Sequence, residues 1–157
     1  TGLITLDPGF KNTGSCESEI TFLDGVVIGR SHIVGRPISI LMSQKRQIGN
    51  ATVTLAHSTT EGVEKRTQKA DIIVSALGIP NFLKGDMVKE GVIIIDVGIT
   101  RVIDKNHPKG YVIKGDVDFK DVSRKSSYIT PVPGGVGPMT IAMLLKNTLL
   151  SCERNTN

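Results

Sequence analysis

Four short runs of mainly apolar, β-branched residues place the strongest constraint on how this chain can fold. They are GVVIG (25–29), ATVTLAH (51–57), ADIIVSALG (70–78) and GVIIIDVG (91–98). Such nearly continuous apolar runs are typical of parallel strands whose sheet is covered on both faces. Helix-compatible segments follow the first three runs, at residues 37–47, 62–69 and 84–89. The alternation predicts an α/β, Rossmann-like doubly wound fold, with a mostly parallel sheet and helices on both faces.

The rest of the chain is predicted in less detail. Residues 100–119 indicate a loop or hairpin excursion, DFKDVSRKSS a short helix, and SYIT a last strand. A final helix is expected over about 139–152, with its MTIAMLL stripe packed in the core. Proline fits the first turn of a helix, so Pro37 is expected at the first helical position and Pro138 within the first turn. Residues 1–24 carry turn signals without periodicity, and no element is assigned there.

Composition narrows the classes of partner. The chain has 157 residues, enough for one domain, and a formal net charge of +4. That charge suits anionic small molecules, but the basic residues are scattered and aromatic residues make up only 4%, which argues against a nucleic-acid partner. Cys16 and Cys152 lie far apart and outside any CxxC pattern, so neither a metal site nor a disulfide framework is expected.

No apolar run reaches transmembrane length, so no membrane partner is expected. The cytoplasm is the default compartment, or an organelle if a targeting segment precedes this sequence.

The turn after the first predicted strand, GRSHIVGRP, is a candidate phosphate site. In an open α/β sheet the ligand crevice lies at the carboxyl ends of the strands. Gly29, Gly35 and Pro37 suit a loop whose backbone meets a phosphate at a helix N-terminus. The spacing does not match G-x-G-x-x-G, so a purely structural turn stays an equal alternative.

The end of the second strand bears on cofactor choice. NAD-binding folds usually place an acid there for the ribose 2′-hydroxyl, whereas this chain has AHSTT and no acid before Glu61. Arg30 and Arg36 lie in the neighbouring turn and could grip a 2′-phosphate, with a hydrogen bond from Ser58. This pattern favours NADP over NAD; the alternative is that both arginines are solvated surface residues.

Small residues end the third and fourth strands, in SALG (75–78) and DVGI (96–99). They leave space for a flat ring, although helix–sheet packing uses the same residues. The stretch ITPVPGGVGPMT (129–140) holds three prolines and three glycines and leads into the final helix. It suits either a flat or anionic ligand or a rigid strand-to-helix connection.

Three acids near these loops are given structural roles. Asp96 is expected to fix loop backbone through hydrogen bonds. Asp116 and Asp118 are expected to cap a turn and the short helix that follows it.

Together these motifs closely resemble the methylenetetrahydrofolate dehydrogenase/methenyltetrahydrofolate cyclohydrolase family. VVIGRSHIVGRP, ATVTLAHS, the segment from ADIIVSALG to DVGI, GDVDF and ITPVPGGVGPMT occur in the family's order, over about residues 25–154. The resemblance implies hydride transfer from the folate's methylene carbon to NAD(P), followed by hydrolysis of the methenyl product to formyltetrahydrofolate. It also implies a homodimer and a folate substrate. The proline–glycine stretch would lie between nicotinamide and folate.

Carried over by motif position, the resemblance assigns site residues along the chain. The residues implied at the cofactor diphosphate and adenosine ribose are Gly29, Arg30, Ser31 and Ile33. Those implied near the 2′-phosphate are His57 and Ser58. Those implied along the ribose and nicotinamide are Ala76, Leu77, Gly78, Val97, Gly98, Ile99, Gly137 and Thr140, and Pro133 would border the folate.

The resemblance also has a gap. The family's catalytic domain carries a Tyr-x-x-x-Lys motif, a glutamine-containing QLPLP-like stretch and an Asp in a DVDG-like loop, and this sequence has none of them. Residues 1–24 are therefore interpreted as an atypical remnant of the linker from that domain, and 25–157 as an NAD(P)-binding domain without catalytic residues. The alternatives are a non-catalytic dinucleotide-binding or regulatory module and, third, a basic nucleic-acid-binding domain.

Overall fold

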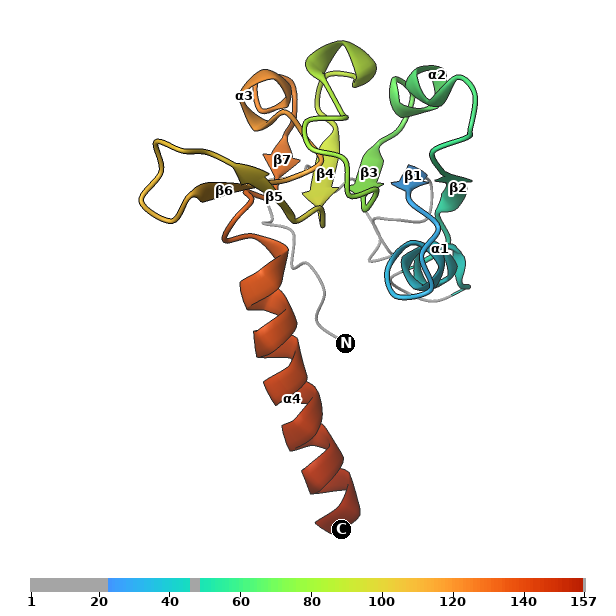
Figure 1. Ribbon diagram of the computed structural model, residues 1–157. Helices are drawn as coiled ribbons and strands as arrows, with labels where there is room; N and C mark the ends of the chain where they lie inside the picture. Colours follow the sequence, from blue (N-terminus) through green and yellow to red (C-terminus); the bar gives the residue numbers. More distant parts are fainter. Residues whose placement is uncertain (1–22, 46–48, 157) are drawn as a thin grey trace.

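A computed structural model describes residues 23–45 and 49–156 of the chain. The interpretation of the first 22 residues lies outside the described residues. The helix expected at 37–47 ends earlier than predicted, at Ser43. Five parallel strands form one sheet in the order β2-β1-β3-β4-β7 (Figure 1). They are β1 (Asp24–Ile28), β2 (Thr52–Ala56), β3 (Ile72–Ser75), β4 (Ile93–Asp96) and β7 (Tyr128–Ile129). The predicted parallel sheet is confirmed, with strands shorter than most of the apolar runs that contain them.

Helices lie on both faces of this sheet, as predicted. They are α1 (Gly35–Ser43), α2 (Val63–Thr67) and α3 (Phe119–Val122), whereas the last helix, α4 (Val136–Thr156), is not among them. In Figure 1, α2 and α3 lie above the sheet and α1 lies below it. The short turn of helix predicted within 84–89 is the three-residue 3₁₀ turn η1 (Gly85–Met87).

The prediction that Pro37 is the first residue of its helix is wrong by two positions, whereas Pro138 lies in the first turn of α4, as predicted. Pro37 and Pro138 each occupy the third residue of their helix. That place is equally permissive, because the first N–H groups of a helix have no partner within it.

The excursion between β4 and β7 is a hairpin. Strands β5 (Thr100–Ile103) and β6 (Tyr111–Lys114) pair antiparallel. The Arg101 guanidinium lies 5.0 Å from the centroid of the Tyr111 ring across the pair. After β6 the chain returns to the main domain, where Val117 bridges Leu83 in parallel. The hairpin therefore leaves and rejoins the domain next to the carboxyl end of β4.

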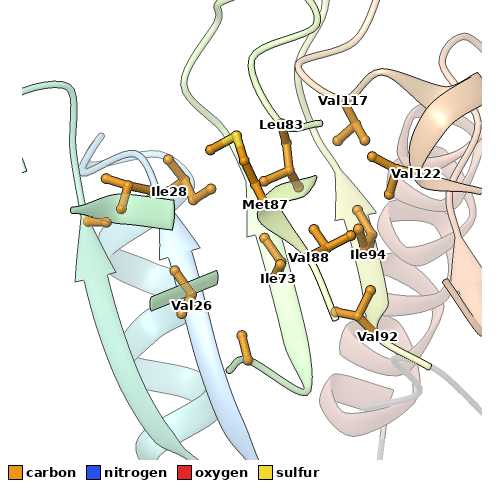
Figure 2. Close-up of a cluster of buried hydrophobic side chains, with 13 residues drawn as sticks. Val26, Ile28, Ile73, Leu83, Met87, Val88, Val92, Ile94, Val117 and Val122 are labelled. Atoms are coloured by element: carbon orange, nitrogen blue, oxygen red, sulfur yellow. The ribbon is translucent and has the colours of Figure 1, made fainter. Parts of the chain in front are cut away.

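The main hydrophobic core lies between the sheet and the layer that holds α2, η1 and α3. Figure 2 shows β-branched side chains of the central strands facing Leu83, Met87 and Val122. Ile73 and Ile94 are almost completely buried in this cluster. Burying each such side chain contributes about 2 kcal/mol, so this layer fixes where the strands end.

Helix α4 does not pack as predicted. It extends away from the sheet (Figure 1), and the side chains of its apolar stripe are 53–67% exposed: Met139, Ile141, Leu144, Leu145 and Leu149. The expectation of core packing is therefore wrong for this chain. Helical spacing predicts that a stripe will be covered, but it does not say by which surface. No helix among the described residues has the length and hydropathy needed to span a bilayer.

A polar cluster joins the starting ends of three strands and generates a stability prediction. Asp71 accepts a hydrogen bond from the Asp24 N–H (2.8 Å), and its other oxygen pairs with Lys89. Its carbonyl accepts from the Ile93 N–H (2.9 Å). Burial raises the pKa of Asp71, but the Lys89 hydrogen bond, the Asp24 N–H and the Lys89 charge together outweigh it and hold the pKa below its ordinary value.

We predict that Asp71→Asn lowers the free energy of unfolding at pH 7. A lowered carboxyl pKa stabilises the fold above the unfolded-state pKa, and that stabilisation is lost as pH falls through the folded-state pKa. Because the pair is about one-third exposed, the expected loss is about 0.5–1 kcal/mol at pH 7, and it is smaller at pH 3, below the unfolded-state pKa. Urea unfolding at both pH values measures it, with Asp86→Asn as an exposed control. An equal loss at both pH values would contradict the role of the charge.

Candidate dinucleotide-binding site

The ends of β1, β2 and β3 meet at a point where the strand order reverses. From β1 the chain crosses to β2 on one side, while β3 lies on the other. The Gly29 N–H donates to the Ala56 carbonyl (2.8 Å), and the Ala76 N–H donates to the Ile28 carbonyl (2.7 Å). Ligands of open α/β sheets bind outside the carboxyl ends of strands at such a reversal.

The turn from β1 to α1 is too tight for side chains at two positions. A Cβ at Gly29 would lie 2.2 Å from the Ala76 carbonyl oxygen, and one at Gly35 would lie 1.8 Å from the Gly29 oxygen. Gly29 also has a φ of +120°. The two glycines thus let the first turn of α1 sit directly beyond β1, at the edge of the crevice. The Arg36 N–H of that turn donates to the Ser31 carbonyl (3.0 Å).

The other residues predicted on this turn are exposed. Arg30, Ser31 and Ile33 all lie at the surface, and Ile33 is 89% exposed. The Ser31 hydroxyl accepts hydrogen bonds from the N–H groups of Val34 (3.1 Å) and Gly35 (3.4 Å). Ser31 therefore shapes the start of α1 in addition to any contact with a ligand.

The end of β2 lies beside this turn. Ile28 pairs with Ala56, so the residues that follow β1 and β2 leave adjacent strands at the same level. The His57 N–H donates to the Thr60 hydroxyl (2.9 Å), and its ring Nδ1 lies 2.9 Å from the Thr59 hydroxyl. Ser58 is exposed. This corner presents hydroxyl and imidazole groups.

The β3 and β4 ends continue the same edge. Ala76, Leu77 and Gly78 directly follow β3, and Val97, Gly98 and Ile99 directly follow β4. The Val97 N–H donates to the Ser75 carbonyl (2.8 Å). The predicted site residues on these two strands are therefore neighbours in space.

The proline–glycine stretch encloses a cavity of about 340 Å³ beside β4. Its lining includes five predicted site residues: Val97, Ile99, Pro133, Gly137 and Thr140. The Val132–Pro133 peptide bond is cis. Helix α4 begins at Val136, so its first turn forms part of the wall. The cavity is large enough for part of a dinucleotide, such as one ring with its ribose.

A larger cavity of about 640 Å³ lies elsewhere and contains no predicted site residue. Residues of the amino-terminal parts of β1 and β2 and residues of α2 line this cavity. The smaller cavity is the better candidate for the ligand site, because ligands of open α/β sheets bind at the carboxyl ends of the strands. Among the described residues no group of His, Cys, Asp and Glu could hold a metal ion.

Two buried carboxylates lie directly behind this edge. Asp96 accepts hydrogen bonds from the N–H groups of Gly98 (2.9 Å), Asp116 (3.1 Å) and Val117 (3.0 Å). The prediction that Asp96 fixes loop backbone is confirmed. Burial raises the pKa of Asp96, the three N–H donors act in the opposite direction, and the Asp116 carboxylate adds to the rise.

The expected cap at Asp116 is wrong, and sequence reasoning missed what this residue does. Its Oδ2 accepts from the N–H groups of Leu77 (2.6 Å) and Gly78 (3.0 Å), which lie 39 and 38 positions earlier. No local pattern points to partners so distant in sequence. Asp118 does cap α3, as predicted, by accepting from the Asp121 N–H (3.4 Å).

Residues 14–156 match the family of the tetrahydrofolate dehydrogenase/cyclohydrolase, NAD(P)-binding domain. The chain belongs to this family. The bifunctional protein FolD of Flavobacterium johnsoniae is 72% identical over 126 residues, which are 80% of this chain and 43% of that protein. FolD of Flavobacterium psychrophilum is 70% identical over 129 residues, 82% of this chain and 44% of that protein. The chain thus spans less than half the length of these curated relatives.

Solved structures of the family show the same fold. The FolD enzyme of Campylobacter jejuni has a TM-score of 0.75 and 51% identity, over 89% of this chain and 45% of that one. The Trypanosoma brucei methylenetetrahydrofolate dehydrogenase-cyclohydrolase, solved with NADP cofactor and an inhibitor, has a TM-score of 0.78 and 42% identity, over 86% of this chain and 45% of that one.

We predict that Gly29→Ala lowers stability by at least about 2 kcal/mol, because the added Cβ meets a backbone carbonyl and φ is positive. Gly137→Ala is the matched control. No atom lies within 4 Å of its ideal Cβ, and alanine favours the helix. Thermal unfolding of the two variants compares them. Equal melting temperatures would show that the β1–α1 turn can open to admit a side chain.

Proposed function

We propose that this chain is the cofactor-binding lobe of an NADP-dependent methylenetetrahydrofolate dehydrogenase that is also a methenyltetrahydrofolate cyclohydrolase. The dehydrogenase passes hydride from the methylene carbon of the folate to NADP, and the cyclohydrolase hydrolyses the methenyl product. The observation that carries the proposal is the cavity between the end of β4 and the proline–glycine stretch, which lies on the same sheet edge as the glycine turn after β1. The FolD names of the relatives support the same reaction.

In this proposal each part of the sheet edge holds one part of the cofactor. The glycine turn, with Arg30, Ser31 and Ile33, lies against the diphosphate and adenosine ribose. Residues 76–78 and 97–99 line the ribose and nicotinamide, with Gly137 and Thr140 on the nicotinamide side. Pro133 borders the folate. The cofactor supplies the hydride chemistry when bound, and the protein orients the two rings.

NADP is proposed over NAD because the β2 end offers no carboxylate to a ribose 2′-hydroxyl. His57 and Ser58 leave β2 at the level of the Arg30 turn, since Ile28 and Ala56 are paired. An exposed arginine beside hydroxyl and imidazole groups suits a phosphate dianion. The NADP bound in the Trypanosoma brucei structure is in keeping with this choice.

The folate-activating residues are proposed to come from a second lobe. Residues 1–24 would be the atypical linker from that lobe, and 25–157 the NAD(P)-binding domain. The exposed apolar stripe of α4 supports this arrangement, because a surface of Met139, Ile141, Leu144, Leu145 and Leu149 is costly to leave in water. The coverage of about 44% of the relatives' length leaves room for such a lobe. The working form is proposed to be a cytoplasmic homodimer.

Calorimetric titration of the chain with NADP and with NAD tests the proposal first. NADP is expected to bind at least about tenfold more tightly than NAD, because charge-assisted hydrogen bonds to the 2′-phosphate add about 1.5–3 kcal/mol. Ser58→Ala should weaken NADP binding and leave NAD binding unchanged. Arg30→Ala should weaken the binding of both, because both carry the diphosphate, and should weaken that of NADP more. Arg124→Ala, an exposed arginine after α3, is the control. Preference for NAD would refute the phosphate argument, and binding of neither would refute the cofactor site.

A second test concerns turnover. The chain alone is expected to show little or no reduction of NADP with methylenetetrahydrofolate, because it lacks the Tyr-x-x-x-Lys motif. Joined to the catalytic lobe of the Flavobacterium johnsoniae relative, it should gain activity, which absorbance of the reduced cofactor measures. Normal turnover by the chain alone would contradict the division into lobes. NADP binding without turnover in the joined protein would favour the regulatory module.

A further inference from the structure

We infer that Asp96 and Asp116 are positioning residues for the cofactor: a pair of buried carboxylates that hold the loops after β3 and β4 in place. The inference rests on the proposed function, since those loops line the proposed nicotinamide site. Asp96 is among the residues that line the cavity beside β4, whereas Asp116 is not. Each acts through backbone N–H groups, and the two differ in a way that predicts opposite responses to the same substitution.

Asp116 holds the loop after β3. It is fully buried, and its Oδ2 accepts from Leu77 N–H (2.6 Å) and Gly78 N–H (3.0 Å), with the Ser75 hydroxyl at 3.5 Å. These N–H groups follow the last residue of β3, so the strand ladder does not satisfy them. Buried N–H groups need an acceptor, and here a carboxylate from the base of the hairpin supplies it.

Asp96 holds the base of the hairpin in turn. Its Oδ1 accepts from Gly98 and Asp116 N–H, and its Oδ2 accepts from Val117 N–H. Its own N–H donates to the Thr130 hydroxyl (2.8 Å), next to the proline–glycine stretch. Asp96 therefore links the β4 loop, the hairpin return and β7, while Asp116 extends the link to the β3 loop.

The enclosure around both carboxylates is tight. A Cβ at Gly98 would lie 2.2 Å from Asp116 Oδ1, and one at Gly115 would lie 2.0 Å from Asp96 Oδ2. The glycines let the carboxylates reach the backbone, and the packing leaves the acids little freedom to turn. The loops are thus held by hydrogen bonds of fixed direction, as preorganised sites require.

The oxygens of the two acids are used differently. All the side-chain hydrogen bonds of Asp116 go to Oδ2, and its buried Oδ1 has no hydrogen-bond partner among the described residues. Both oxygens of Asp96 accept N–H groups. An asparagine at 116 can keep its oxygen toward Leu77 and Gly78 and place its NH₂ on the unused side. An asparagine at 96 must turn its NH₂ toward at least one N–H donor, which leaves two donors facing each other.

The experiment compares Asp116→Asn, Asp116→Ala and Asp96→Asn in the 157-residue chain. Amide hydrogen exchange of Leu77, Gly78 and Gly98 is measured without cofactor, and NADP affinity by calorimetry. The exchange rates and the NADP affinity of Asp116→Asn should both stay within about threefold of those of the unmodified chain. In Asp116→Ala the amides of Leu77 and Gly78 should exchange faster than in the unmodified chain. In Asp96→Asn the amide of Gly98 should exchange faster. Each change should be at least about tenfold, as for loss of a charge-assisted hydrogen bond, with a similar loss of NADP affinity.

Asp121→Asn is the control for a merely stabilising role. Asp121 also holds a backbone N–H with its carboxylate, that of Gly85 (2.7 Å), but this bond joins α3 to η1 and involves neither the loop after β3 nor the loop after β4. The Asp121→Asn substitution should lower the melting temperature. It should neither speed amide exchange at residues 77, 78 and 98 nor reduce the affinity for NADP. If Asp121→Asn weakens NADP binding as much as Asp116→Ala does, the pair acts only through stability and the inference is wrong.

Two further outcomes are distinct. Equal effects of asparagine at 96 and 116 would overturn the inference, because it depends on their different use of the two oxygens. If Asp96→Asn does not fold, the contrast between asparagine and alanine at 116 decides the question. If the unmodified chain fails to bind NADP, the proposed function fails, while the exchange comparison still tests whether the carboxylates hold the loops.

Discussion

Hydrogen bonds between backbone groups at the carboxyl ends of the parallel strands are the interaction on which the rest of this structure depends. Gly29 bonds to Ala56, Ala76 to Ile28, and Val97 to Ser75, each at 2.7–2.8 Å. Parallel strands place their ends at one edge, and these bonds hold the loops that follow at a common level. Every residue proposed at the cofactor lies on a loop or a helix start at that edge.

Few backbone hydrogen bonds join β4 to β7 at that side of the sheet, and side chains accept hydrogen bonds from the remaining backbone N–H groups. Strand β7 has only two residues, and the β5–β6 hairpin interrupts the chain between β4 and β7. Asp96, Asp116 and Thr130 supply acceptors there for N–H groups that no strand pairs. A buried carboxylate is expensive to desolvate, and satisfied N–H donors offset that cost. The hydrogen bonds of these side chains therefore hold the loops beside the proposed nicotinamide site, where strand pairing alone would not hold them.

Helix α4 shows the opposite situation, an apolar surface without a partner among the described residues. Its first turn lines the cavity, and its exposed stripe extends beyond the domain. A surface that covered the stripe would also hold the mouth of the cavity. In the proposed two-lobe enzyme, docking of the lobes and assembly of the site would thus be the same event.

The sequence by itself determined the parallel sheet, because Val- and Ile-rich runs separated by helical segments have few other stable arrangements. It also determined the glycine turn at Gly29, the hairpin excursion and the α3 cap at Asp118, since each depends on residues close together in the chain. The assignment of site residues came from motif order, and the structure places them along one edge.

Only the tertiary structure decided that Asp116 holds a loop 38 residues away, that the short turn of helix within residues 84–89 is a 3₁₀ turn, and that the α4 stripe is exposed. Local patterns state which residues need burial or a hydrogen-bond partner, whereas the fold decides which distant group supplies it.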